Sequence, residues 1–208
     1  MKNIIFLFML LNLVCIGCSE ITVNEPRINE NVIIPLQLGN VWNYHISVFT
    51  NDSIMFVEYD RHNKIIKDTV ADNERWFLTS TENSSVDSFW CINRDDGYWV
   101  KPVLDDTLSF NVIPFMKYKY PCKVGDIFEA SIDWEVINVD TAVEVQSGTF
   151  KCILFRTRTY YNPQSSYEED FVAVNIGLVM LRTYNRLSNG DPYLFSIHEL
   201  SSLDLIKE

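Results

Sequence analysis

The sequence predicts an all-β domain built from one antiparallel sheet or barrel. Apolar and polar residues alternate with a period of two, and turn residues separate short segments at regular intervals. Apart from the N-terminal segment, no stretch of about 12 residues or more has helical periodicity. The regular spacing favours one domain over two. Residues 197–206 fit either a strand or one short helix.

The first predicted strand shows the alternation most clearly. Trp42 and Tyr44 fall on one face, and the polar residues between them fall on the other. After a turn at 51–52 the same period continues through 55–59, and a second turn is predicted at 60–64. This part of the chain therefore predicts two short strands, each with one apolar face.

Later segments are assigned in the same way. Residues 75–82 are predicted as a strand and residues 87–101 as a hairpin, because the pair Asp96-Gly97 is typical of a tight turn. Residues 149–160 begin with apolar side chains on both faces, which indicates a strand inside the sheet. The remaining strands are predicted as a pair at 127–136 and 139–146, and at 177–185 and 192–200.

The N-terminus has the pattern of an export signal. Lys2 precedes an apolar run at 4–16, which is too short for a comfortable membrane span of about 20 residues. The run ends at a small residue followed by Cys18. This end resembles the lipobox of bacterial lipoproteins, with Cys15 where Leu is usual. The resemblance implies a signal peptide at 1–17 and lipidation of Cys18; an ordinary secretory signal cut nearby is the alternative.

The resemblance also implies a location. Ser19 is not the Asp that usually retains lipoproteins at the inner membrane, which implies the outer membrane of a Gram-negative bacterium. Several acyl chains on Cys18, palmitate among them, would hold the protein there, since each buried methylene contributes about 0.8 kcal/mol. Residues 18–33 are polar, contain Pro26 and lack periodicity, and they predict a tether ahead of a single β domain at 34–208.

Charge and composition exclude some classes of partner. The net charge is −11, and removal of residues 1–17, where Lys2 is the only charged residue, makes it −12. An acidic surface disfavours nucleic acid and electrostatic docking to anionic lipid head groups. We interpret the acidity as a source of solubility.

Three cysteines remain in the mature chain, and an odd number allows one disulfide with a free thiol or three buried thiols. Each has apolar or aromatic neighbours, so small buried side chains are the preferred interpretation. These cysteines are Cys91, Cys122 and Cys152. We also assign to the core, rather than to ligand stacking, the aromatic residues Trp90, Tyr98 and Trp99.

Three motifs follow one another along the domain. Residues 35–44 (PLQLGNVWNY) resemble P-L-x-x-G-x-x-W-x-Y, residues 147–152 (SGTFKC) contain G-T-F, and residues 171–179 (FVAVNIGLV) resemble Y-A-x-G-V-G-L-V with Asn175 in place of Gly. Together they resemble a group of uncharacterised bacterial secreted lipoproteins, distantly similar to periplasmic lipoprotein carriers. The resemblance implies a curved antiparallel sheet, half-barrel or open barrel. None of the matched residues is catalytic in type.

Catalytic and metal-binding patterns are missing from the sequence. It contains no G-x-S-x-G, no H-E-x-x-H and no phosphate-binding glycine loop. His45 is placed on a polar strand face and His62 in a turn, and neither stands near a motif nucleophile or carboxylate. The acidic pairs at 95–96 and 105–106 lack the spacing of a calcium loop and are interpreted as turn residues. We therefore predict no enzyme, no metal and no cofactor.

A local basic stripe is the remaining polar feature. Arg156 and Arg158 share one strand face, and we expect cross-strand pairs with acidic residues after the next turn. An anionic-ligand site is the alternative. The acidic candidates are Glu168, Glu169 and Asp170.

Two functions stay open. The first is a non-enzymatic interaction or scaffold module of the cell envelope, with a protein partner and with the membrane reached through the lipid on Cys18. The alternative is a carrier or binder of a lipid-like or other apolar ligand on the concave face that the resemblance implies. Its candidate ligand-facing residues are Trp42, Tyr44 and Phe150. The first function ranks slightly higher, because only the resemblance indicates a cavity.

Overall fold

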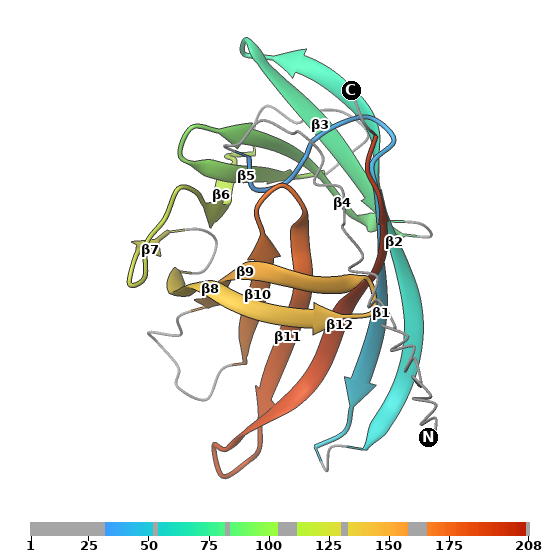
Figure 1. The fold of residues 1–208 in the computed structure, drawn as a ribbon, viewed down its shortest axis with the longest axis vertical. Helices are drawn as coiled ribbons and strands as arrows, with labels where there is room; N and C mark the ends of the chain where they lie inside the picture. The colour runs from blue at the N-terminus through green and yellow to red at the C-terminus, as the bar shows by residue number, and fades with distance from the viewer. Residues whose placement is uncertain are drawn as a thin grey trace, which may run out of the picture.

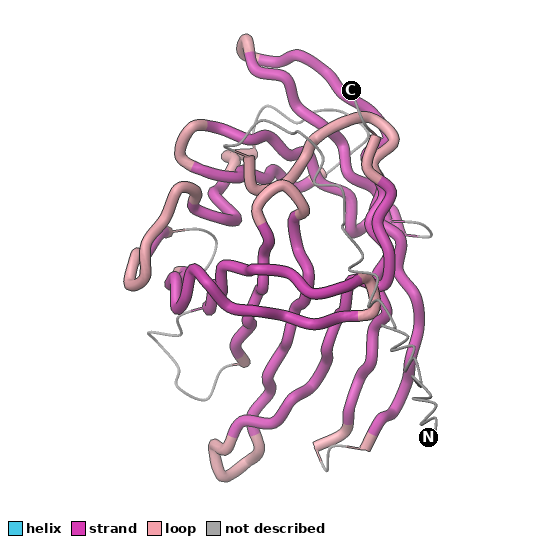
Figure 2. Tube along the Cα trace, in the orientation of Figure 1, coloured by secondary structure: helices cyan, strands magenta, loops and turns pink. Residues whose placement is uncertain are grey.

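The structure is a computed structural model that describes residues 32–51, 54–81, 84–103, 112–129, 133–157 and 166–206. All regular secondary structure in these ranges is β-strand (Figure 1), and the remainder is loop (Figure 2). The all-β prediction is confirmed, and residues 197–204 lie in a strand rather than a helix. No helix suited to crossing a membrane occurs among the described residues. The predicted signal peptide, Cys18, most of the tether and the acidic pair at 105–106 lie outside them.

The described strands form one antiparallel sheet in the order β6-β5-β4-β3-β2-β1-β12-β11-β10-β9-β8-β7. Strands that are consecutive in the chain are therefore neighbours in the sheet, except for β6 and β7, and β1 also pairs with β12. The strand bounds are β1 Val41–Phe49, β2 Met55–Ala71, β3 Glu74–Thr81, β4 Ser84–Arg94, β5 Gly97–Pro102, β6 Phe115–Lys119, β7 Ile127–Phe128, β8 Trp134–Val145, β9 Gly148–Thr157, β10 Tyr167–Ala173, β11 Gly177–Arg186 and β12 Pro192–Asp204.

The sheet curls into a nearly closed barrel with one unsealed seam. β6 and β7 are its two edges, yet only residues 120–126 separate them in the chain. A chain reaches about 3.5 Å per residue at most, so this short link draws the edges together. Lys119 Nζ lies 2.9 Å from Asp126 Oδ2, and the Gly125 amide donates to the Val136 carbonyl at 2.8 Å. The predicted single curved sheet is confirmed.

The predicted turn at 60–64 is wrong. β2 runs without interruption from Met55 to Ala71, and its polar residues pair across the sheet instead of turning the chain. His62 is one of them, and its Nδ1 lies 2.5 Å from Asn43 Oδ1 on β1. The turn comes later, at Asp72 (φ 54°) and Asn73 (φ 63°), where two positive φ values are typical of a type I′ hairpin.

The predicted hairpin of 127–136 with 139–146 is also wrong. β7 has only two residues, and β8 continues through the supposed turn to pair with β9. Register irregularities at Asn138 and Thr141 explain the error, because a bulge places turn-like polar residues inside a continuous strand. The short β6 was not predicted as a strand, and β10 was implied only by the cross-strand pairs expected for Arg156.

The hairpin at the Asp-Gly pair is confirmed. Arg94 at the end of β4 is paired with Gly97 at the start of β5. A Cβ atom at Gly97 would lie 2.2 Å from the Tyr118 carbonyl oxygen, so glycine is needed for β6 to approach. Asp96 belongs to this turn, and its Oδ1 accepts a hydrogen bond from Trp99 Nε1 at 2.8 Å.

Hydrophobic side chains pack on both faces of the sheet. The barrel interior holds the larger cluster, which includes the fully buried Ile46 and Phe155. Successive residues of a strand point to opposite faces, so Trp76 and Trp90 form a smaller cluster outside, while Cys91 points inward. Trp90 and Tyr98 are buried, as predicted, and Trp99 packs half-buried against the outer cluster.

The three described cysteines are free thiols. Cys91 and Cys152 are buried, and Cys122 is half-buried. Burial raises the pKa of Cys91 and Cys122 to about 11 and the pKa of Cys152 to about 12. Few thiolates therefore form near neutral pH.

We expect iodoacetamide to label these thiols slowly in the folded protein, because the thiolate is the reactive form. Cys122 should react first, since it alone is partly accessible. Mass spectrometry of a labelling time course at pH 8 measures this order, and the same reaction in urea provides the control. Rapid labelling of Cys91 before Cys122 would contradict the burial seen here.

Candidate functional site

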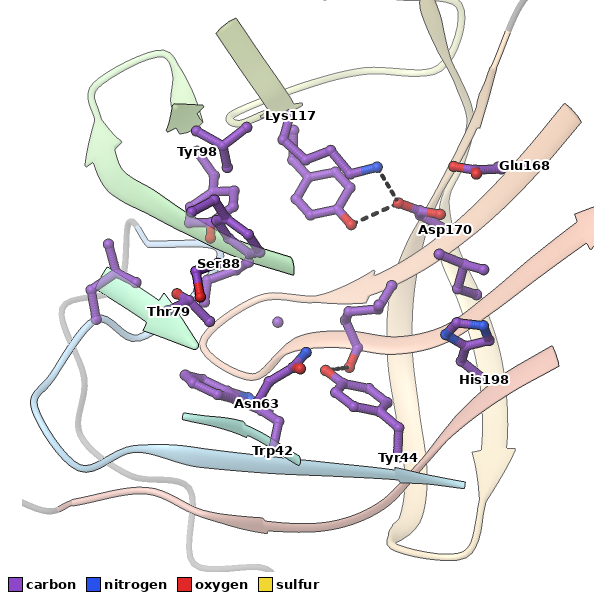
Figure 3. A pocket seen from close by; sticks show the side chains of 18 of the residues that line it. Trp42, Tyr44, Asn63, Thr79, Ser88, Tyr98, Lys117, Glu168, Asp170 and His198 are labelled. Atoms are coloured by element: carbon purple, nitrogen blue, oxygen red, sulfur yellow. Dashed lines mark hydrogen bonds and ion pairs between the residues drawn. The ribbon is translucent and has the colours of Figure 1, made fainter. Parts of the chain in front are cut away.

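A cavity of about 610 Å³ lies inside the barrel (Figure 3). Its size falls within the usual range for small-ligand sites, about 300–1,000 Å³. Strands from both halves of the sheet contribute to the wall, which is largely apolar and aromatic. The aromatic lining residues are Trp42, Tyr44, Phe89, Tyr98, Phe115, Tyr118 and Trp134.

Trp42 and Tyr44, two of the three predicted ligand-facing residues, line this cavity. Trp42 Nε1 donates to the Ile176 carbonyl at 2.7 Å, and the Tyr44 hydroxyl donates to the Leu178 carbonyl at 3.0 Å. Their polar atoms are thus satisfied by backbone, which leaves the rings as apolar wall. Phe150 is not among the lining residues; it packs half-buried against the interior cluster.

The segment ahead of β1 contributes to the cavity wall. Ile34 and Leu36 line it, and Asn40 holds the segment in place. Asn40 is buried; its Nδ2 donates to the Pro35 carbonyl at 3.0 Å, and its Oδ1 accepts from the Ile206 amide at 2.8 Å. The motif at the start of the domain therefore anchors the cavity wall to the C-terminal end of the chain.

Residues 32 and 33, assigned to the tether from sequence, are part of the packed structure. The Val32 carbonyl accepts a hydrogen bond from the Asn175 amide at 3.1 Å, and Ile33 is 1% exposed. Asn175 has a φ of 62°, the left-handed conformation that Asn tolerates in place of glycine. This contact places the segment just ahead of the first motif against the third motif, and the Trp42–Ile176 hydrogen bond joins the two motifs directly.

A fully buried carboxylate is the main polar feature of the cavity. Asp170 on β10 has 0% side-chain exposure. Its Oδ2 accepts from the Tyr118 hydroxyl at 2.7 Å and lies 3.1 Å from Lys117 Nζ. The same ammonium lies 4.1 Å from the centre of the Trp134 ring. Asp170 Oδ1 has no hydrogen-bond partner among the described residues.

Further charged groups line the same cavity. Arg61 donates to Asn63 Oδ1 at 3.3 Å and to Thr81 Oγ1 at 3.1 Å. Figure 3 shows Glu168 and His198 on the same side of the cavity as Asp170. Burial raises the pKa of Glu168. Burial, with Arg61 nearby, lowers the pKa of His198 to about 4, so His198 is neutral at neutral pH.

The predicted cross-strand pairing of Arg156 is confirmed. Its guanidinium donates to Glu169 Oε1 from Nε at 3.0 Å and from Nη2 at 2.5 Å. Glu169 lies opposite Arg156 on the neighbouring strand, as the register requires. Arg158, the second residue of the predicted stripe, lies outside the described ranges.

Sequence reasoning missed the polar centre of the cavity. Lys117 and Tyr118 lie on β6, which was not predicted, and Asp170 lies on β10, where only a pair with Arg156 was expected. One signal was present, because Asp170 directly precedes the apolar run that starts at Phe171. A buried carboxylate needs a hydrogen-bond or ionic partner. The partner, Tyr118, is 52 residues away in the chain, so the sequence alone does not identify it.

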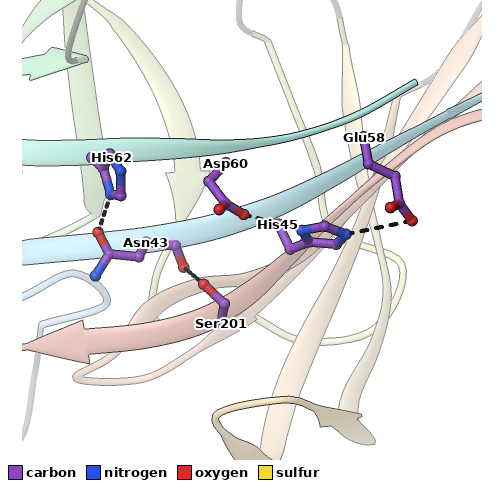
Figure 4. Close-up of polar contacts among 6 residues, drawn as sticks. All are labelled: Asn43, His45, Glu58, Asp60, His62 and Ser201. Atoms are coloured by element: carbon purple, nitrogen blue, oxygen red, sulfur yellow. Dashed lines mark hydrogen bonds and ion pairs between the residues drawn. The ribbon is translucent and has the colours of Figure 1, made fainter.

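His45 lies outside the barrel between two carboxylates (Figure 4), which corrects the expectation that none stands near it. Its Nδ1 is 3.0 Å from Asp60 Oδ1, and its Nε2 is 3.7 Å from Glu58 Oε1. The two carboxylates approach opposite ring nitrogens, so they do not converge on one ion. Among the described residues, no group of three His, Cys, Asp or Glu side chains is arranged to hold a metal.

The pKa values of His45 and His198 are expected to be shifted in opposite directions. The hydrogen bond with Asp60 raises the pKa of His45, whereas burial lowers that of His198. The stabilisation from charged His45 is therefore complete below the ordinary pKa of about 6.5, and it is lost as the pH rises through the folded-state value. NMR titration of the ring protons measures both pKa values, and Asp60→Asn should return His45 towards its ordinary value. An unchanged His45 pKa in that variant would contradict the assignment.

Comparison with known proteins shows the fold. No protein-family model matches the chain, and no curated protein has significant sequence similarity to it. A solved Bacteroides fragilis protein, inferred to be exported and described as having a YmcC-like fold, is 13% identical with a TM-score of 0.53, covering 84% of this chain and all of its own. A solved Parabacteroides distasonis protein, inferred to be a lipoprotein, is 12% identical with a TM-score of 0.51, covering 85% of this chain and all of its own. At such identities the similarity extends to the fold alone.

Proposed function

We propose that this chain is a lipid-anchored protein of the bacterial cell envelope that binds a lipid-like, largely apolar ligand inside its barrel, without catalysis. The interior cavity of about 610 Å³ is the observation that carries the proposal. Its aromatic and aliphatic wall provides apolar contact area, and Figure 3 shows Lys117, Glu168 and Asp170 together on one side of it. The ligand-binding function therefore moves ahead of the scaffold function that ranked first from sequence.

An apolar track at one end of β2 supports the proposal. Arg61 and Asn63 line the cavity, and the alternation of the strand places Tyr59 and Val57 on the same inner face. Tyr59 is 50% exposed and Val57 is 41% exposed. Grouped exposed apolar side chains commonly mark a binding surface. A ligand longer than the cavity would extend along this track.

The envelope location and the anchor belong to the same proposal. One structural neighbour is described as exported and the other as a lipoprotein, which supports an envelope location. The lipobox-like end at Cys18, and the resemblance to secreted lipoproteins, support lipidation and the outer membrane. Metabolic labelling with radioactive palmitate tests the anchor. Label is expected in the wild-type chain, and label that persists in Cys18→Ala would overturn the assignment.

Native mass spectrometry of the full chain, purified from its own membrane, tests the ligand. We expect a population that carries an added mass of lipid, which is released on unfolding. Extraction followed by lipid analysis would then identify the class of the ligand. A preparation that shows only the mass of the free protein, from several mild extractions, would contradict the proposal.

A large side chain that fills the cavity should weaken ligand binding. Ser88 is a small, half-buried lining residue, so Ser88→Trp places a large ring in the space of the ligand. We expect binding of a fluorescent alkyl probe to weaken at least about tenfold, a loss of about 1.4 kcal/mol. The matched control is Val70→Trp, because Val70 is 71% exposed and outside the cavity lining. Equal binding by both variants would contradict a ligand site in the barrel.

A separate surface favours the interaction function as a second candidate. The start of β2 exposes Phe56 at 76%, on the face opposite to Val57, with Ile54 at 63% just before the strand. This patch could contact an envelope protein partner. A photo-crosslinking residue at position 56 should give a reproducible adduct in cells, with position 70 as the control. The absence of any adduct specific to position 56 would contradict this candidate.

A further inference from the structure

Asp170 leaves one carboxylate oxygen without a hydrogen bond. Oδ2 has two partners, Tyr118 and Lys117, but Oδ1 has none among the described residues. An unsatisfied buried polar atom destabilises the folded protein, and more strongly when the group is charged. Such atoms are rare in native structures and call for a physical explanation.

The position of Asp170 supplies a reason for the missing partner. Its side chain is fully buried within the protein and lines the cavity rather than the solid part of the core. Figure 3 shows it on the side opposite Thr79 and Ser88. A ligand that fills the cavity therefore meets this carboxylate, with the aromatic residues along the rest of its length.

The charges around Asp170 indicate what kind of donor fits. Lys117 lies 3.1 Å from Oδ2, and the same cavity is lined by Arg61 and by a second carboxyl group, Glu168. Two basic groups already face two acidic groups, so a neutral donor adds the missing hydrogen bond without adding charge. A hydroxyl group has this chemistry.

We propose that Asp170 Oδ1 accepts a hydrogen bond from a hydroxyl head group of the bound amphiphile, whose alkyl chain lies along the aromatic wall. This inference rests on the proposed function and adds the ligand class, a hydroxyl-bearing lipid such as a monoacylglycerol or a long-chain alcohol. It also places the head group of the ligand between β6 and β10.

A pair of ligands that differ only at the head group tests the inference. The full chain, kept soluble in amphipol, is loaded with a fluorescent alkyl probe. The probe is then displaced by monolauroylglycerol or by the same molecule with both hydroxyls methylated. Because hydrogen bonds to charged groups are stronger than those between neutral groups, we expect wild type to prefer the hydroxyl form by at least about tenfold.

Two variants test whether Asp170 is the source of the preference for the hydroxyl ligand. Asp170→Asn can turn an amide donor towards the cavity, so we expect it to lose the preference for the hydroxyl form and to bind both ligands within about threefold. The control is Asp126→Asn, which removes another carboxylate paired with a β6 lysine but lies outside the cavity lining. That variant should keep the wild-type preference.

The outcomes separate the two proposals. If both ligands displace the probe from the wild-type protein equally well, a lipid site exists but Asp170 does not recognise a hydroxyl group. The inference is then overturned. If neither ligand nor probe binds, the proposed function is overturned as well. The wild-type comparison decides the inference even where Asp170→Asn fails to fold. An unchanged preference in a folded Asp170→Asn would also overturn it.

Discussion

Replacement of Phe155 by Ala is expected to lower the free energy of unfolding by about 3–5 kcal/mol, the usual cost of removing a buried phenylalanine. Phe155 lies on β9 and is 0% exposed. Its ring centre lies 5.2 Å from that of Tyr118 on β6 and 5.9 Å from that of Phe128 on β7. These strands are the two edges of the sheet, so the phenyl ring packs against both sides of the seam.

Urea denaturation followed by tryptophan fluorescence measures this loss. The control is Phe195→Ala on β12, where the side chain is 37% exposed, and we expect a cost of about 1 kcal/mol or less. The contrast separates the packing of Phe155 from the general effect of removing a phenyl ring. A loss of about 1 kcal/mol or less in Phe155→Ala would contradict the role assigned to this ring at the seam.

Replacement of Lys117 by Met is expected to cost about 3 kcal/mol of stability. Removing one partner of a buried ion pair typically costs about 3–5 kcal/mol, because the remaining charge is left buried without compensation. Asp170 is fully buried, whereas the Lys117 side chain is 26% exposed, which places the expected value at the lower end. The loss of the ammonium beside the Trp134 ring contributes in the same direction.

Lys119→Met is the matched control, two residues further along β6. Its ion pair with Asp126 is more exposed, with 34% and 12% side-chain exposure, and we expect a cost of about 1 kcal/mol or less. Both substitutions remove one positive charge from the same strand, so the net charge changes equally. Equal losses in the two variants would show that the carboxylate of Asp170 does not depend on Lys117.

The local alternation of apolar and polar residues was sufficient to predict most of the strands. Trp42 and Tyr44 point inward because alternation determines the face of each side chain, and the turn at Asp96-Gly97 lies where its chemistry placed it. Pattern failed at residues 60–64 and at Asn138, where polar residues belong to continuous strands. Asp60 and His62 are satisfied by cross-strand partners, and a single sequence does not reveal such partners.

The sequence by itself determined the all-β class, the inward face of the first strand and the acidic charge, because each depends on neighbouring residues or on composition. The tertiary structure decided the closure of the sheet, the cavity and the environment of Asp170. Tyr118 meets Asp170 across 52 residues, and β1 meets β12 at the far end of the chain. Such contacts depend on strand register and on the approach of the sheet edges, which are set by the summed packing of the whole domain.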